Sequence, residues 1–137
     1  MNNTLYNFTL FFMRLAPSLA MLYYHGAAKV SMVFAGKTQG FPDPLGMGSG
    51  VSLYAATFAE TLCPALIILG VFTRSAALIA CVNMAVAVWY LHTQAGSSFE
   101  LPVLYLAFFA AIAFAGAGEW SVDGAKSWSG WFYRDSK

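Results

Sequence analysis

Long runs of apolar residues dominate this chain and leave few folds open to it. Of its 137 residues, 59% are hydrophobic and only 9% are charged, whereas soluble domains carry roughly 25% charged residues. Runs of about 20 apolar residues cross a bilayer as helices, because a helix bonds its own backbone polar groups internally. We therefore predict an all-α integral membrane protein, a four-helix bundle that forms one domain over residues 1–137.

Breaks in the apolar pattern divide the chain into four predicted spans. Residues 36–50 are dense in Gly and Pro and predict an irregular loop. The short turn at residues 70–74 predicts that the helices on either side of it are antiparallel neighbours. Pro102 suits the first turn of the last span. The predicted spans cover residues 6–34, 51–71, 75–91 and 101–117, and the Trp-rich segment after them predicts a short interfacial helix.

Charge is sparse and is distributed unevenly about the predicted membrane. The net charge of +1 and the scattered basic residues exclude the basic surface that nucleic-acid binding needs. Lys37 lies in the loop after the first span, whereas the opposite side carries Arg74, Lys126, Arg134 and Lys137. The positive-inside rule then places both termini in the cytoplasm.

The two cysteines, Cys63 and Cys81, lie inside apolar stretches. Their separation matches no zinc-ligand or redox spacing, and it indicates no extracellular disulfide framework. We interpret them as small buried hydrophobic residues. A contact between them is geometrically allowed, because the two helices around the turn are predicted to be antiparallel.

Polar residues gather on one face of the first span. At the helical rotation of about 100° per residue, a stripe roughly 80° wide is formed by Arg14, Ser18, Met21, His25, Lys29 and Met32. A charge inside a bilayer is costly, so such residues turn inward and find partners. Glu60 is the only acid deep in another predicted span. We therefore predict that Glu60 pairs with Arg14 or Lys29, and the sequence leaves both partners open.

Asn83 and Tyr90 share one face of the third span and extend this polar set. Structural contacts between helices would explain a single buried pair, whereas a set this large favours a pocket for a polar head group. His25 has two further interpretations: it is a proton carrier, or it is a haem ligand opposite His92.

The other five acids lie outside the predicted spans. Glu100 follows Ser97 by three residues, which is the spacing of a helix capping box. The alternative for Glu100 is a second acid at the mouth of the pocket. Asp43 and Asp123 are expected to be solvated or interfacial.

Five segments of the chain carry a resemblance to a known family. They are RLAPSLAMLYYHGAAKV, GFPDP, FAETLCPALIILGVFTR, SFELPVLYL and GAGEWSVDG. In this order they resemble the DoxX family of small four-helix bacterial membrane proteins. The resemblance implies a bacterial inner-membrane protein linked to quinone redox chemistry. Such proteins are similar to quinone-reducing membrane subunits of thiosulfate oxidation, or to partners in oxidoreductase complexes that handle thiols and oxidative stress.

The leading hypothesis is a redox-associated membrane protein that binds a quinone-like ligand within the bundle. Arg14, Lys29 and His25 would donate hydrogen bonds to its carbonyl oxygens, and Glu60 would accept or relay a proton. The expected catalytic residues are Glu60 and His25. The expected ligand-binding residues are Arg14, Lys29, Met21, Asn83, Tyr90, His92 and Glu100, with Met32 beside Met21 on the apolar wall.

Electrons would have to come from outside the chain, since the sequence has no recognisable site for flavin, an iron–sulfur cluster or nicotinamide. The expected source is a soluble or membrane redox partner, or a substrate thiol. Two alternatives are a non-catalytic accessory or assembly subunit of a larger membrane complex, and a small-solute carrier. A carrier with so few helices would need a homo-oligomer to form a path through the membrane.

Overall fold

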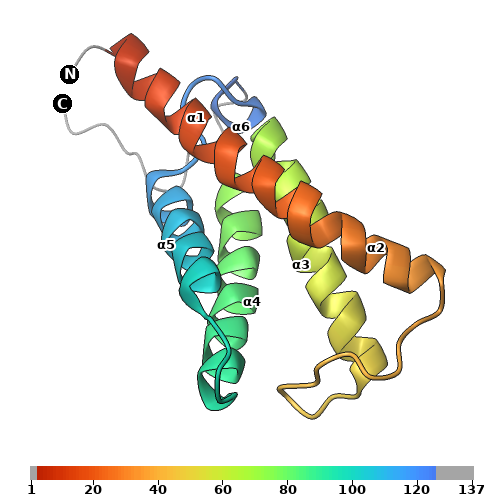
Figure 1. The fold of residues 1–137 in the computed structure, drawn as a ribbon. Coiled ribbons are helices and arrows are strands. Elements are labelled where there is room, and N and C mark those ends of the chain that lie inside the picture. The colour runs from red at the N-terminus through yellow and green to blue at the C-terminus, as the bar shows by residue number, and fades with distance from the viewer. Residues whose placement is uncertain (1–2, 126–137) are drawn as a thin grey trace.

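The computed structural model describes residues 3–125, and these residues form helices joined by loops and turns. Figure 1 shows the order of the elements along the chain. The elements are α1 (Asn3–Met21), the π-helix η1 (Leu22–Gly26), α2 (Ala27–Phe34), α3 (Ser49–Leu69), α4 (Thr73–Thr93), α5 (Glu100–Ala115) and the short α6 (Val122–Ala125). The predicted all-α class is confirmed.

Apolar helices of membrane-spanning length make up most of the described chain. Three segments are long and apolar enough to cross a bilayer: Thr4–Phe34, Ser49–Leu69 and Thr73–Thr93. The fourth helix, α5, has 16 residues and is about 24 Å long, somewhat less than the ~30 Å of a hydrocarbon core. It ends at Ala115, earlier than predicted, because Gly116 leaves the helical conformation with φ 82°.

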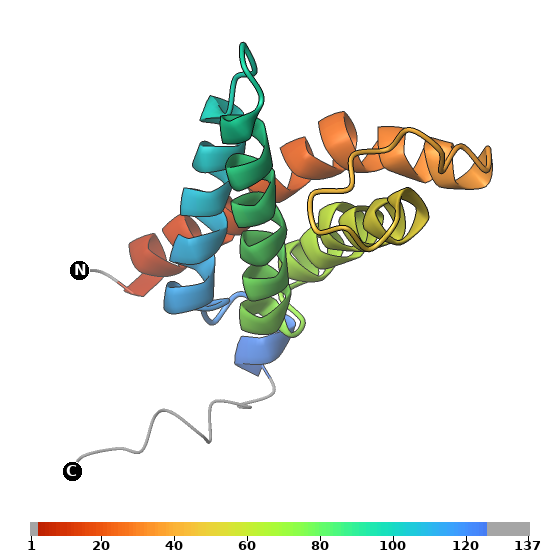
Figure 2. The ribbon, with the colours of Figure 1, turned by 90° about the horizontal axis from the view of Figure 1, so that it is seen from below.

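The helices are arranged as a tight pair crossed by a long tilted helix. α4 and α5 run antiparallel and side by side, while α1, η1 and α2 form one continuous tilted element that crosses them (Figures 1 and 2). α3 and α4 lie close together at the turn that joins them, and they diverge toward the 36–48 loop. The core where they meet contains Met21, Cys63, Ile67, Ala76, Ala77, Ala80, Met84, Tyr105, Phe109 and Ile112.

The turn between α3 and α4 is built as the sequence predicts, with the two helices as antiparallel neighbours. Gly70 has φ 71° and its N–H donates to the Ile67 carbonyl, while the Val71 N–H donates to the Leu66 carbonyl. This pair of bonds is a Schellman motif, which satisfies carbonyls that the helix end would leave unpaired.

Asp123 caps the start of α4 from a distant part of the chain. Its carboxylate accepts the Phe72 N–H at 3.0 Å and the Thr73 N–H at 2.9 Å, and its own N–H donates to the Gly70 carbonyl at 2.8 Å. The first N–H groups of a helix have no intrahelical partner, so a carboxylate there is favoured. Asp123 is thus a specific helix cap, a role that the sequence alone did not indicate. The rest of the predicted interfacial tail, residues 126–137, lies outside the described residues.

The predicted capping box at Ser97 and Glu100 is wrong. α5 begins at Glu100 itself, and the residue before it, Phe99, makes no side-chain cap bond. Ser97 instead lies in a turn in which its N–H donates to the Gln94 carbonyl. Pro102 does lie in the first turn of α5, where its missing N–H costs nothing.

Large apolar side chains cover the outer surface of the helices. Phe34 is 87% exposed, Phe114 is 85% exposed and Tyr23 is 76% exposed. A soluble protein rarely leaves so much apolar surface in water. In a bilayer the same side chains contact lipid, which agrees with a membrane bundle.

Candidate functional site

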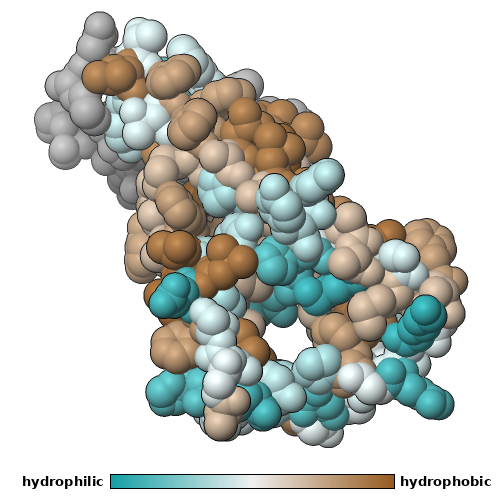
Figure 3. All heavy atoms as spheres, in the orientation of Figure 1, coloured by the Kyte–Doolittle hydropathy of each residue, from teal (hydrophilic) through white to brown (hydrophobic). Residues whose placement is uncertain are grey.

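A cleft of about 590 Å³ opens where α3 diverges from α4. Figure 3 shows the opening on this face, with hydrophilic residues along its inner border. Small residues on one face of α3 leave the space: Ser52, Ala55, Ala56 and Ala59 follow the spacing that places residues on one side of a helix. The facing wall comes from α4, through Leu78, Ile79, Val82, Val86, Ala87, Tyr90 and Leu91.

The 36–48 loop closes one end of this cleft with apolar side chains. Phe41, Pro42, Pro44, Leu45 and Met47 all line the space. They line the same space as residues of α3 and α4, and they therefore form part of the cleft wall.

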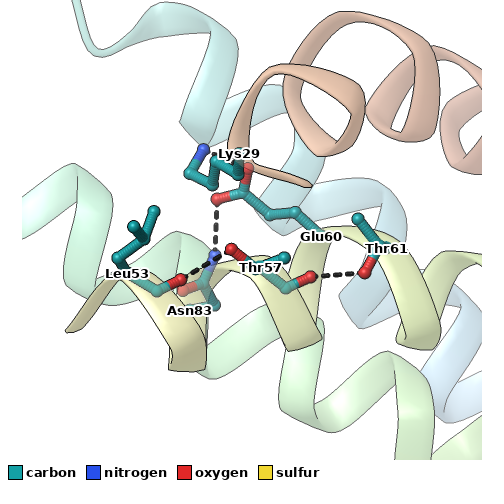
Figure 4. A network of polar contacts seen from close by, with 6 residues as sticks. All are labelled: Lys29, Leu53, Thr57, Glu60, Thr61 and Asn83. Carbon is teal, nitrogen blue, oxygen red and sulfur yellow. Dashed lines mark hydrogen bonds and ion pairs between the residues drawn. The ribbon is translucent and has the colours of Figure 1, made fainter. Parts of the chain in front are cut away.

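Three polar side chains meet on the inner border of the cleft. The Lys29 ammonium of α2 forms an ion pair with Glu60 Oε2 of α3, and Asn83 Nδ2 of α4 donates to Glu60 Oε1 at 3.0 Å. Figure 4 shows the three side chains pointing toward one another from three helices. The Glu60 side chain is 7% exposed and that of Lys29 is 18% exposed. The predicted Glu60 pair is confirmed, with Lys29 as the partner.

The local structure of α3 presents Glu60 to its partners. Thr57 Oγ1 donates to the Leu53 carbonyl at 2.7 Å, and Thr61 Oγ1 donates to the Thr57 carbonyl at 2.6 Å. These bonds satisfy hydroxyls that would otherwise be unpaired in an apolar helix. Pro64 lies inside α3 and has no N–H for the Glu60 carbonyl, which a regular helix would pair.

Gly26 allows the first span to approach α3 at this carbonyl. A Cβ at Gly26 would lie 2.6 Å from the Glu60 carbonyl oxygen and 2.8 Å from Thr61 Cγ2. Only a glycine permits so close a contact between backbones. The contact holds Lys29, one turn further along, at the height of Glu60.

His25 lies behind the cleft, in the π-helical turn η1. Its ring meets the Tyr105 ring edge-on, with 5.6 Å between centroids, and its Nε2 is buried with no hydrogen-bond partner in the described residues. A π-turn often marks a functional position. The His92 ring packs against a different side chain, that of Phe99, with 5.4 Å between centroids.

Arg14 is separated from the Lys29–Glu60–Asn83 cluster. Its guanidinium donates to the Trp120 carbonyl at 2.6 Å and to the Ile67 carbonyl at 3.5 Å, and the residue is only 1% exposed. Arg14 therefore ties α1 to the end of α3 and to the segment before α6. Because Arg14 and Lys29 lie about 22 Å apart along one continuous helix, the predicted stripe serves two different sites.

The remaining predicted ligand residues fall in different places. Asn83 and Tyr90 line the cleft. Met21 is buried in the core beside Cys63 and Ile67. Met32, His92 and Glu100 are absent from the residues that line the cleft. Both cysteines are free thiols; Cys63 is buried as predicted, whereas Cys81 is only partly buried.

Comparison with known proteins identifies the family. A family model described as DoxX matches residues 9–93, which is more than half of the chain and includes the whole Lys29–Glu60–Asn83 cluster. The chain belongs to the DoxX family. It is thus a membrane protein of a redox-linked family. A Haemophilus influenzae protein described as an uncharacterized protein is 35% identical over 116 residues, which cover 75% of this chain and 80% of that protein. No solved structure matches.

Most of the apolar cleft wall of this DoxX protein was not predicted from its sequence. The signal was the small-residue face of α3 at Ser52, Ala55, Ala56 and Ala59, opposite the larger apolar residues of α4. On α4, the small residues Ala76, Ala77 and Ala80 are buried in the core and allow close helix packing. On α3 the same residue type leaves a space.

Asp43 fixes the loop that closes the cleft. Its carboxylate accepts the Ser52 hydroxyl at 2.7 Å, the Gly48 N–H at 2.7 Å and the Met47 N–H at 3.0 Å. The Ser52 hydrogen bond is the largest of the effects that hold the pKa of Asp43 below its ordinary value of 3.8, followed by the Gly48 N–H. Asp43 is thus a loop anchor rather than a purely solvated acid.

Acidification is expected to release this loop. Since the pKa of Asp43 is lower in the folded state, its contribution to stability is complete above the unfolded pKa and is lost as the pH falls through the folded one. The midpoint of thermal unfolding in detergent should therefore be higher for the wild type than for Asp43→Asn at neutral pH, and this difference should shrink below about pH 4. A difference that is constant with pH would contradict the role of the carboxylate.

Proposed function

We propose that this protein supports a membrane oxidoreductase system by binding a quinone-like molecule in the cleft between α2, α3 and α4. The observation that carries the proposal is a cluster of hydrogen-bonding groups, Lys29, Glu60 and Asn83, on the inner border of an otherwise apolar cleft. A polar ring with an apolar chain matches this division, because ligand sites commonly combine apolar walls with a few polar groups.

The size and position of the cleft support an amphiphilic ligand. Its volume of about 590 Å³ falls within the roughly 300–1,000 Å³ of small-molecule sites. The wall of α4 consists largely of aliphatic residues, and Val82 and Leu78 are more than half exposed. An isoprenoid or alkyl chain could lie along this wall and extend into the surrounding lipid.

Each polar group has a chemical role in the proposal. A quinone supplies two-electron chemistry and takes up protons as it is reduced. The Lys29 ammonium has three N–H donors, of which the ion pair with Glu60 engages one, so it can also donate to a carbonyl oxygen. Asn83 orients the Glu60 carboxylate through the 3.0 Å hydrogen bond, and Glu60 can hold or release a proton next to the head group. His25, behind the cleft, is the proposed second proton carrier.

The electron source is proposed to be a redox partner or a substrate thiol. The described residues contain no group of three or more His, Cys, Asp or Glu that could hold a metal ion. The thiols of Cys63 and Cys81 lie outside the cleft wall.

We further propose a bacterial inner membrane with cytoplasmic termini. Arg14 and Arg74 both lie toward the α6 end, since Arg14 bonds Trp120 and Arg74 follows the α3–α4 turn, and basic residues favour the cytoplasmic side. The loop that closes one end of the cleft would then lie on the opposite side.

Quinone retention provides the direct test. The wild type, purified in mild detergent and reconstituted with ubiquinone or menaquinone, is expected to retain quinone after gel filtration, as measured by solvent extraction and mass spectrometry. The double variant Lys29→Met with Glu60→Gln removes both charges together and is expected to retain at least about tenfold less.

The matched control is Glu119→Gln. Glu119 lies outside the cleft and accepts a hydrogen bond from Asn7 Nδ2 at 2.6 Å, which a glutamine oxygen can also accept. This variant should retain quinone as the wild type does. A folded wild-type protein that retains no quinone, or a double variant that retains as much as the wild type, would refute the proposed site.

A further inference from the structure

We infer that the cleft selects ligands with an uncharged head group and rejects amphiphiles with a charged one, such as fatty-acid anions and alkylammonium ions. The inference rests on the proposed function, because it concerns the same cleft, and it names the property by which the ligand is chosen. It derives from the charges that line the cleft and from how they are paired.

The cleft wall carries one cation and one anion among the described residues. Among the described residues that line the cleft, Lys29 is the only basic one and Glu60 the only acidic one, and they balance each other in a direct ion pair. The other polar groups of the lining are the Asn83 amide and the hydroxyls of Ser52 and Tyr90. The wall therefore offers hydrogen bonds without net charge.

A charged head group would meet an unfavourable environment here. A bound carboxylate would have to share the Lys29 ammonium with Glu60. Two anions would then lie beside one cation in a largely apolar space. An alkylammonium ion would likewise bring a second cation to the single carboxylate. Like charges held close together in a region of low dielectric repel strongly. An uncharged carbonyl or hydroxyl can bond to Lys29 or Asn83 and leave the ion pair intact.

The other charged groups near the cleft, among the described residues, do not line it. Asp43 lies at the loop end outside the lining, where Ser52 and two backbone N–H groups hold its carboxylate. Arg14 bonds carbonyls at the opposite end of the first span and does not line the cleft. His25 lies behind the ion pair, against Tyr105.

Removing one member of the pair should change the selectivity in a predictable direction. In Glu60→Gln the Lys29 charge is no longer balanced, so the cleft becomes a site for anions. In Lys29→Met the Glu60 charge is no longer balanced, so the cleft becomes a site for cations. The geometry of the remaining groups is nearly unchanged, because glutamine and methionine have lengths similar to those of the residues they replace.

Three probes of comparable chain length test this inference: a decyl-substituted benzoquinone, dodecanoate and dodecylammonium. Their binding is measured on the full chain in phosphatidylcholine nanodiscs at about pH 8, where the acid and the amine are both charged. The wild type is expected to bind the benzoquinone at least about tenfold more tightly than either ion. Glu60→Gln should gain about tenfold or more for dodecanoate, and Lys29→Met should gain similarly for dodecylammonium. Glu119→Gln should match the wild type.

The outcomes separate this inference from the proposed function. A wild-type protein that binds benzoquinone but also binds dodecanoate equally well would overturn the charge rule and leave the quinone site standing. Failure to bind benzoquinone, together with the expected gains in the two variants, would sink the quinone proposal and support the charge rule. If neither single variant folds, the wild-type selectivity among the three probes still decides the inference.

Discussion

Replacing Gly26 with valine is expected to lower the free energy of unfolding by about 3 kcal/mol, the upper part of the range for overpacked sites. A Cβ at this position would lie 2.6 Å from the Glu60 carbonyl oxygen and 2.8 Å from Thr61 Cγ2. The first of these contacts is with backbone, which cannot move aside as a flexible side chain can. The first span must therefore separate from α3, which also carries Lys29 away from Glu60.

Gly50→Ala is the matched control for this prediction. Gly50 lies in the first turn of α3, and a Cβ there would lie 3.8 Å from Thr38 Cβ, an ordinary contact. Alanine is favoured over glycine in a helix by roughly 0.5–1 kcal/mol, so this variant should be as stable as the wild type or slightly more stable. The measurement is chemical unfolding of both variants in mixed micelles. A Gly26→Val protein of wild-type stability would contradict the close approach at Glu60.

Breaking the Lys29–Glu60 pair from either side is expected to cost about 3 kcal/mol, the lower end of the range for buried pairs. The lower end applies because the Lys29 side chain is 18% exposed, whereas that of Glu60 is 7% exposed. Lys29→Met leaves a carboxylate with Asn83 as its hydrogen-bond partner, and Glu60→Gln leaves an ammonium ion without a counter-charge. Each leaves one charge uncompensated in an apolar setting.

The double variant Lys29→Met with Glu60→Gln should be more stable than either single variant, because it removes both charges. The two single variants and the double variant form a thermodynamic cycle, measured by the same unfolding assay. A double variant that loses the sum of the two single losses would show that the two side chains do not interact. Glu119→Gln again serves as the carboxylate control, since its partner Asn7 is uncharged.

The helices of this protein follow closely from its sequence. The long apolar segments and the Gly- and Pro-rich breaks predicted the positions of all four apolar helices to within a few residues. Their ends were less predictable. The Ser97–Glu100 spacing suggested a capping box that does not form, and the cap on α4 comes from Asp123 instead. A cap supplied from a distant segment leaves no local pattern.

The candidate site was only partly predictable. A buried acid in a membrane span needs a positive partner, so the sequence could limit the partner of Glu60 to Arg14 or Lys29. It could not decide between them, because both lie on the stripe expected of a uniform α-helix. The choice depends on where α3 crosses the first span, and that crossing is at Gly26.

The sequence by itself determined that the protein lies in lipid and that its secondary structure is helical. Its apolar runs favour lipid, where only a helix bonds the backbone polar groups of such a run internally, and its buried charges must be paired there. The tertiary structure alone decided how those elements meet. Because α3 diverges from α4, the small residues on one face of α3 line a cleft instead of packing against α4. The close backbone contact at Gly26 sets Lys29 beside Glu60 and leaves Arg14 to tie α1 to the end of α3 and to the segment before α6. Local composition fixes the free energy of placing each residue in the membrane, whereas helix crossing is set by contacts between residues far apart in the chain.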